Sequence, residues 1–141
     1  MADQEYLRAN KDRTMEIRSE NWELISLFCV EPILTDPEAP WCYNRVLFQT
    51  EMPSGRVSLT LEPGDDYVQF VSEDPTGSAV NLELTTVEYV QVRRCDEEEW
   101  LVVVTKDAPQ VVLVIGLSPR IAIRIGMASG MRTVASLSRQ P

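Results

Sequence analysis

Apolar and polar residues alternate with a period of two through much of this chain, most clearly near its middle. Between residues 80 and 84 valine and leucine alternate with asparagine and glutamate, which predicts a strand with one buried face. The alternation changes phase at Val87, so a bulge or corner is expected near Thr85 and Thr86. Residues 101–104 are all apolar and rich in valine, which favours a strand covered on both faces. We therefore expect a central hairpin over residues 80–105.

Other stretches show the same strand-like pattern and are separated by proline, glycine and aspartate turns. They are residues 43–52, 57–62, 67–71, 111–117 and 121–125. Short strands joined by short turns are typical of a β-sandwich or a closed barrel. The predicted fold is mainly β, a single-domain antiparallel β-sandwich or partly open barrel of about seven to nine strands. A barrel of the pleckstrin-homology type is the alternative.

Helical periodicity is confined to the two ends of the chain. Trp22, Ile25 and Phe28 recur at helical spacing, so a short helix is expected there with Ser19 as its N-cap. A weaker helix is predicted over residues 3–13, capped by Asp3 and prone to fray. The β domain is expected to span residues 1–125, with residues 126–141 as a flexible tail or a docking helix weakened by its glycines.

Charge is distributed unevenly along the chain, whose net charge is −9. Residues 21–118 hold five basic and seventeen acidic side chains, a net charge of −12, whereas residues 119–141 hold four basic side chains and no acidic one. A body this acidic repels a phosphate backbone, so nucleic acid is not expected to bind directly. It attracts basic partners instead, or keeps the protein in solution.

Neither a membrane span nor a secretory leader is visible in the sequence. Cys29, Cys42 and Cys95 form an odd set without metal-binding spacing, which favours reduced thiols and a cytoplasmic protein. A bridge between Cys29 and Cys42 remains the alternative.

Histidine is absent from the chain, which removes the commonest general base and the usual triads of hydrolases. No glycine-rich phosphate-binding motif is present either. The acidic pairs Asp65/Asp66 and Glu73/Asp74 lie in predicted turns, where water keeps carboxylates at their ordinary acidity. Such pairs also raise the alternative of a calcium site, although their spacing matches no calcium-binding loop. We expect no enzymatic activity, no cofactor and no metal.

Recognition of another protein is the function that these observations favour. Trp41 and Tyr43 follow a proline-rich loop and have the character of interface anchors. Acidic residues at two predicted turns are expected to complete the partner-binding surface: Asp65, Asp66, Asp96, Glu97, Glu98 and Glu99. The hairpin-tip acids have a simpler alternative role, which is to keep two apolar strands from aggregating.

A small acidic β domain without histidine is typical of inhibitor proteins, such as immunity proteins that neutralise a basic toxin or nuclease. We therefore expect a non-enzymatic acidic protein-binding domain with a basic protein partner. The alternatives are a calcium- or carbohydrate-binding β-sandwich module, in which Trp41 and Tyr43 stack on sugars, and a structural subunit of an oligomer.

Overall fold

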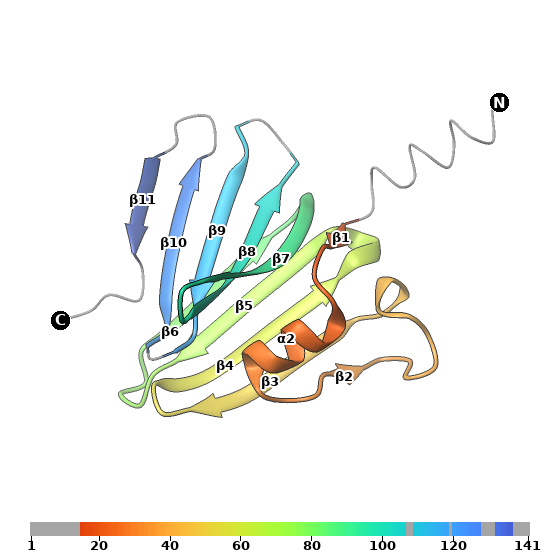
Figure 1. The fold of residues 1–141 in the computed structure, drawn as a ribbon, viewed down its shortest axis with the longest axis horizontal. Helices are drawn as coiled ribbons and strands as arrows, with labels where there is room; N and C mark the ends of the chain where they lie inside the picture. Colours follow the sequence, from red (N-terminus) through yellow and green to blue (C-terminus); the bar gives the residue numbers. More distant parts are fainter. Residues whose placement is uncertain (1–14, 107–108, 119, 128–131, 137–141) are drawn as a thin grey trace.

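The computed structural model describes residues 15–106, 109–118, 120–127 and 132–136, which form two β-sheets and one short α-helix (Figure 1). The six-stranded sheet has the order β1 (Glu16–Ile17), β7 (Val87–Cys95), β8 (Glu98–Thr105), β9 (Val111–Gly116), β10 (Ala122–Met127) and β11 (Arg132–Ser136). The five-stranded sheet has the order β2 (Ile33–Leu34), β3 (Val46–Met52), β4 (Gly55–Glu62), β5 (Tyr67–Glu73) and β6 (Ala79–Leu84). The predicted β-sandwich is confirmed.

The hydrophobic core is formed mainly by alternate residues of the central strands. Val57, Leu59 and Leu61 of β4 are buried, as the period-two pattern predicts. Strand β8 differs, because all four residues 101–104 are buried, which confirms the prediction of a strand covered on both faces. Removing these apolar surfaces from water is the main favourable contribution to the stability of the fold.

Helix α2 (Asn21–Phe28) contacts both β3 and β7, so it packs against both sheets. Its Phe28 ring stacks on Phe48 of β3 at 5.0 Å between ring centroids. The helix is where the sequence predicts it, but the predicted N-cap, Ser19, is wrong. Glu20 is the N-cap and forms a reciprocal capping box with Glu23. The Ser19 hydroxyl instead accepts a hydrogen bond from the Val92 backbone N–H at 2.7 Å, which fixes α2 to β7.

The expected corner at Thr85–Thr86 is confirmed, and it carries the chain from one sheet to the other. Strand β6 ends at Leu84, Thr86 has a φ of 55°, and β7 begins at Val87 in the other sheet. The expectation of one hairpin over residues 80–105 is therefore wrong in its first half. The hairpin is β7–β8, and β6 is an edge strand of the opposite sheet.

Strands outnumber the seven to nine predicted, because eleven form among the described residues. Strands β1 and β2 have two residues each, too few to give a period-two pattern. Strand β11 replaces part of the expected flexible or helical tail, and it pairs antiparallel with β10. The predicted helix over residues 3–13 lies outside the described residues. No helix in the part of the chain that the structure describes is long and apolar enough to cross a membrane.

Candidate partner-binding surface

The loop before β3 holds the two predicted aromatic anchors on a short 3₁₀-helix, η1 (Trp41–Tyr43). Buried Asn44 organises this loop: its side-chain amide donates hydrogen bonds to the carbonyl oxygens of Asp36, Ala39 and Pro40, and its side-chain oxygen accepts one from the Asp36 N–H. Trp41 is half-buried, with its ring edge-on to Phe48, whereas Tyr43 is 81% exposed. Trp41 therefore anchors the loop to the core, and Tyr43 is the aromatic side chain that a partner can reach.

Asp65 and Asp66 lie at the turn between β4 and β5, near η1, and differ in their surroundings. Asp65 is exposed, but Asp66 binds Lys106 at 2.8 Å between Oδ2 and Nζ. The Asp66 carbonyl also accepts a hydrogen bond from the Val87 N–H at 2.9 Å. Asp66 therefore links the two sheets at the β6–β7 corner, a structural role that the sequence pattern does not indicate.

Replacing Lys106 with Met is expected to lower the free energy of unfolding by about 2 kcal/mol, because the Asp66 carboxylate then has no charged partner in a largely buried position. The two side chains are 23% and 19% exposed, so salt screens this pair only weakly. Urea denaturation at low and high salt measures the change. The control is Arg56→Met, which breaks the exposed pair with Glu51 and should cost at most about 0.5 kcal/mol. Equal losses for the two variants would contradict the structural role of Asp66.

The acidic hairpin tip, Asp96 to Glu99, lies far from Asp65 and Asp66. Asp66 is bonded to residues at the beginning of β7 and just after β8, whereas the tip joins the other ends of these strands. Strand β7 has nine residues, which at about 3.3 Å per residue separates the two acidic groups by about 30 Å. The predicted surface in which the tip and Asp65/Asp66 form a single anionic face is therefore wrong.

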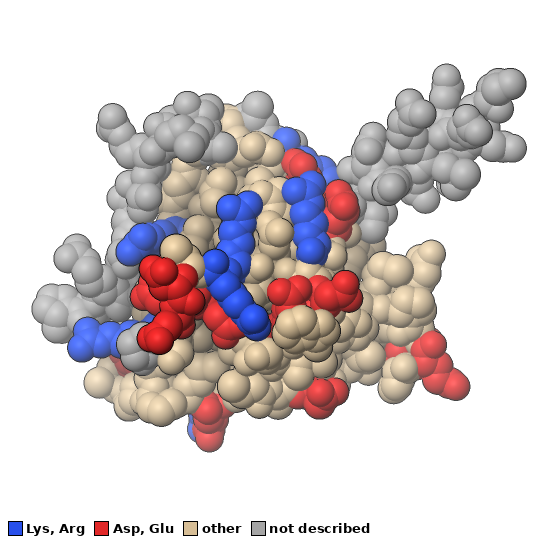
Figure 2. Space-filling view, viewed as in Figure 1, with Lys and Arg blue, Asp and Glu red and all other residues tan. Residues whose placement is uncertain are grey.

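Other acidic residues lie beside the tip instead, from the turns of the five-stranded sheet. Glu51, Glu73 and Asp74 line a shallow hollow of about 390 Å³ with Met52 and with Arg56, which binds Glu51 at 3.0 Å. Met52 also lines the neighbouring hollow that Glu97, Glu98 and Glu99 border. We call this surface the acidic end, consisting of Glu51, Glu73, Asp74, Asp96, Glu97, Glu98 and Glu99. Figure 2 shows carboxylates gathered on the left of the molecule, where the β7–β8 tip lies in Figure 1. Three hairpin turns thus contribute to one anionic surface.

Sequence reasoning did not assign Glu51, Glu73 and Asp74 to this surface. The signal that could have found them is strand register, because Met52–Gly55 and Glu73–Ala79 pairings place two turns at one end of the sheet.

Asp74 is also held in its ionised form. The hydroxyl of Thr76 donates a hydrogen bond to its carboxylate at 2.6 Å, and this bond lowers the pKa of Asp74.

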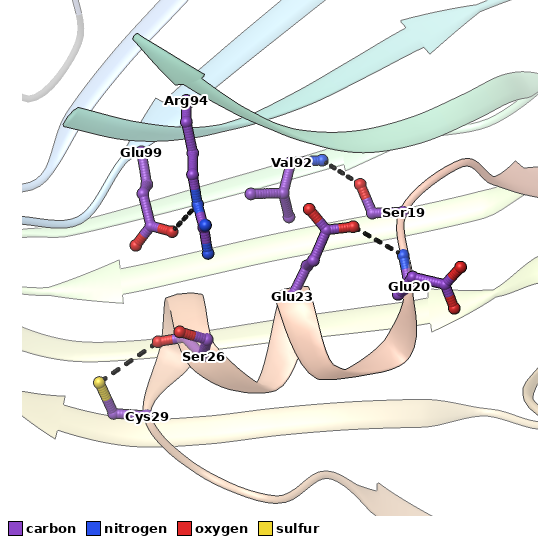
Figure 3. A network of polar contacts seen from close by, with 8 residues as sticks. All are labelled: Ser19, Glu20, Glu23, Ser26, Cys29, Val92, Arg94 and Glu99. Carbon is purple, nitrogen blue, oxygen red and sulfur yellow. Dashed lines mark hydrogen bonds and ion pairs between the residues drawn. The ribbon is translucent and has the colours of Figure 1, made fainter. Parts of the chain in front are cut away.

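Within the tip, Asp96 and Glu97 form a two-residue turn, and Asp96 has a φ of 58°. Glu99 binds Arg94 at 2.6 Å, and both side chains extend from their strands toward α2 (Figure 3). Arg94 also lies over the exposed ring of Trp22, at 5.7 Å from its centroid. Asp96, Glu97 and Glu98 form no ion pair with any described residue. Their charges are therefore available to a partner.

The described residues contain no group of three or more His, Cys, Asp or Glu side chains placed to hold a metal ion. Cys29, Cys42 and Cys95 are exposed and unpaired, so the alternative of a Cys29–Cys42 bridge is wrong.

Comparison with known proteins gives one informative result. No protein-family model matches the sequence, and no curated protein matches it significantly. The structure is similar to a chain from a solved "contact-dependent growth inhibition toxin - immunity protein complex" from Klebsiella pneumoniae 342, with a TM-score of 0.67. The two chains are 14% identical, and the match covers 82% of this chain and 99% of the other. The likeness is one of fold.

Proposed function

We propose that this chain is a non-enzymatic acidic protein that binds and neutralises a basic toxin, as an immunity protein does, and that it acts in the cytoplasm. The observation that carries the proposal is the likeness of fold to a chain of a toxin–immunity protein complex over most of both chains. Because a fold can host unrelated functions, the proposal also needs a surface suited to such a partner.

The acidic end supplies that surface. Three of its carboxylates, on Asp96, Glu97 and Glu98, form no ion pair with the described residues. Opposite charges on two proteins steer their encounter and raise the association rate, and they disfavour acidic partners. A toxin that acts on an anionic substrate such as nucleic acid presents a basic surface, to which this end is complementary. Binding there would cover the surface with which the toxin meets its substrate.

The proposal is tested with the product of the reading frame adjacent to this gene, expressed alone and together with this chain. Growth arrest by the neighbour alone, and growth when both are expressed, is the expected result. Association of the purified proteins should weaken steeply as salt is raised, because charge screening shortens the range of steering. A neighbour that remains toxic, or a protein stabilised against heat by calcium or by a glycan, would overturn the proposal and favour a calcium- or carbohydrate-binding module.

Replacing Asp96, Glu97 and Glu98 together with Ser is expected to lower the association rate constant for the toxin roughly tenfold at low salt, with little change in the dissociation rate. Glu99 is retained because its replacement would release Arg94. Stopped-flow mixing at two salt concentrations measures both rates.

The matched control replaces three exposed acidic residues elsewhere, Glu31, Glu38 and Asp65, with Ser. It removes the same charge from outside the acidic end and should leave the association rate within about twofold of the original. Equal effects from the two triple variants would show that net charge alone matters. An unchanged rate in the tip variant would leave these residues only a role against aggregation.

A further inference from the structure

A hollow of about 750 Å³ opens at the acidic end, where both sheets and α2 meet. It is bounded by the C-terminus of α2, the β3–β4 turn, the β7–β8 tip and the segment after β9. The residues that line it are Ser26, Leu27, Cys29, Met52, Pro53, Ser54, Glu97, Glu98, Glu99, Leu117 and Ser118. No basic residue is among them, and three glutamates are.

Apolar side chains form another part of this lining. Leu27 and Leu117 are buried core residues, and Met52 packs against the core cluster. Methionine is flexible enough to adapt to the shape of a bound group. A side chain with a long aliphatic stem would therefore find apolar contact in the hollow.

The glutamates at the edge of the hollow are the charged part of the site. Glu97 and Glu98 form no ion pair with described residues, whereas Glu99 already binds Arg94. Ser54 also lines the hollow, but its hydroxyl oxygen is buried. The hollow therefore offers the carboxylates of Glu97 and Glu98, which form no ion pair with described residues.

Helix α2 adds negative potential from a separate source. Its last turn and its C-cap, through Ser26, Leu27 and Cys29, line the hollow, and Cys29 adopts the left-handed conformation that ends the helix. The C-terminal end of a helix carries partial negative charge, which Lys or Arg usually offsets in the last turn. That turn contains no basic residue here. The helix end and the glutamates thus both favour a cation in the same hollow.

We propose that this hollow is the binding site for an arginine side chain of the basic partner. The apolar lining holds the aliphatic stem, and the guanidinium group binds the carboxylates of Glu97 and Glu98. Arginine fits better than lysine because its charged group is planar, less strongly hydrated and able to bind two carboxylate oxygens together. The inference rests on the proposed function for the identity of the partner, but the site itself does not require the toxin.

The test uses N-acetyl-arginine amide as the probe and N-acetyl-citrulline amide, which has nearly the same shape without the charge, as its control. The methyl signals of Leu27, Met52 and Leu117 are followed by two-dimensional NMR during titration of the full chain. Saturable shifts of these signals with the arginine probe, and none with the citrulline probe, are expected. Unmoved signals with arginine, or equal shifts with both probes, would overturn the proposal.

Two matched variants locate the charge. Replacing Glu97 and Glu98 with Gln should weaken binding of the arginine probe about fivefold, because each partly exposed ion pair contributes modestly. Replacing Glu31 and Glu38 with Gln should leave it unchanged, and the NMR spectrum verifies that both variants keep the fold. Equal weakening in both variants would reject the site. Probe binding without toxin neutralisation would reject the proposed function alone, and neutralisation without probe binding would reject this site alone.

Discussion

Replacing Phe48 with Ala should lower the free energy of unfolding by about 3–5 kcal/mol. Phe48 is completely buried, stacks on Phe28 of α2 at 5.0 Å, and meets the edge of Trp41 at 5.8 Å. Its ring thus joins the five-stranded sheet to the helix and to η1. Truncation removes apolar contact with both and leaves a cavity in a close-packed core.

Urea denaturation followed by circular dichroism measures this loss, and Tyr43→Ala is its control. Tyr43 lies in η1 but its side chain is almost fully exposed, so its truncation should change stability by no more than about 0.5 kcal/mol. A loss below about 1 kcal/mol for Phe48→Ala would mean that α2 does not depend on this contact.

Replacing Gly55 with Ala should destabilise the protein by about 3 kcal/mol, because the position combines backbone strain with a steric clash. Gly55 begins β4 with a φ of 138°, which L-residues rarely adopt. An added Cβ would also lie 2.2 Å from the Glu73 carbonyl oxygen of β5. Relief requires the backbones of β4 and β5 to separate at the acidic end.

The control is Gly64→Ala in the turn before β5, where an added Cβ meets no atom within 4 Å. This change should be neutral or should stabilise the protein by up to about 1 kcal/mol, because alanine lowers the conformational entropy of the unfolded chain. Thermal denaturation of both variants checks the pair of predictions. Similar melting temperatures for the two variants would contradict the close approach of β4 and β5.

The sandwich could be predicted because its central strands carry their own signal. Residues 57–61 place leucine and valine on one face at every second position, and residues 101–104 are apolar throughout. The corner at Thr85–Thr86 was predictable for the same reason, since a change of parity has to be absorbed by the backbone. Each of these signals is local in the sequence.

Features that depend on distant partners could not be predicted. Strand β1 exists because its two residues pair with β7. Ser19 does not cap the helix because its hydroxyl accepts a hydrogen bond from the Val92 N–H. Strand β11 pairs with the edge of β10, although the same residues also suit a weak helix. Local propensity is too weak a prior to decide such cases.

The candidate site likewise combines features that have a local signal in the sequence with features that depend on distant residues. The exposure of Asp96, Glu97 and Glu98 follows directly from their position at a tight turn. The separation of this tip from Asp65 and Asp66 depends instead on how the two sheets are connected. The partnership of Asp66 with Lys106 spans 40 positions in the sequence, so no local pattern indicates it. The same is true of the hollow, whose lining comes from four separate segments.

The parallel pairing of β1 with β7 also sets an order in which the chain can fold during its synthesis. The hydrogen bond between Ser19 and Val92 joins residues 73 positions apart. At ribosomal speeds of roughly 5–20 residues per second, β7 is synthesised on the order of ten seconds after β1. Until then the first strand has no edge to join, and the side of α2 that faces β7 has nothing to cover it. The nascent N-terminal segment is therefore open to proteases and chaperones for longer than any later part of the sandwich.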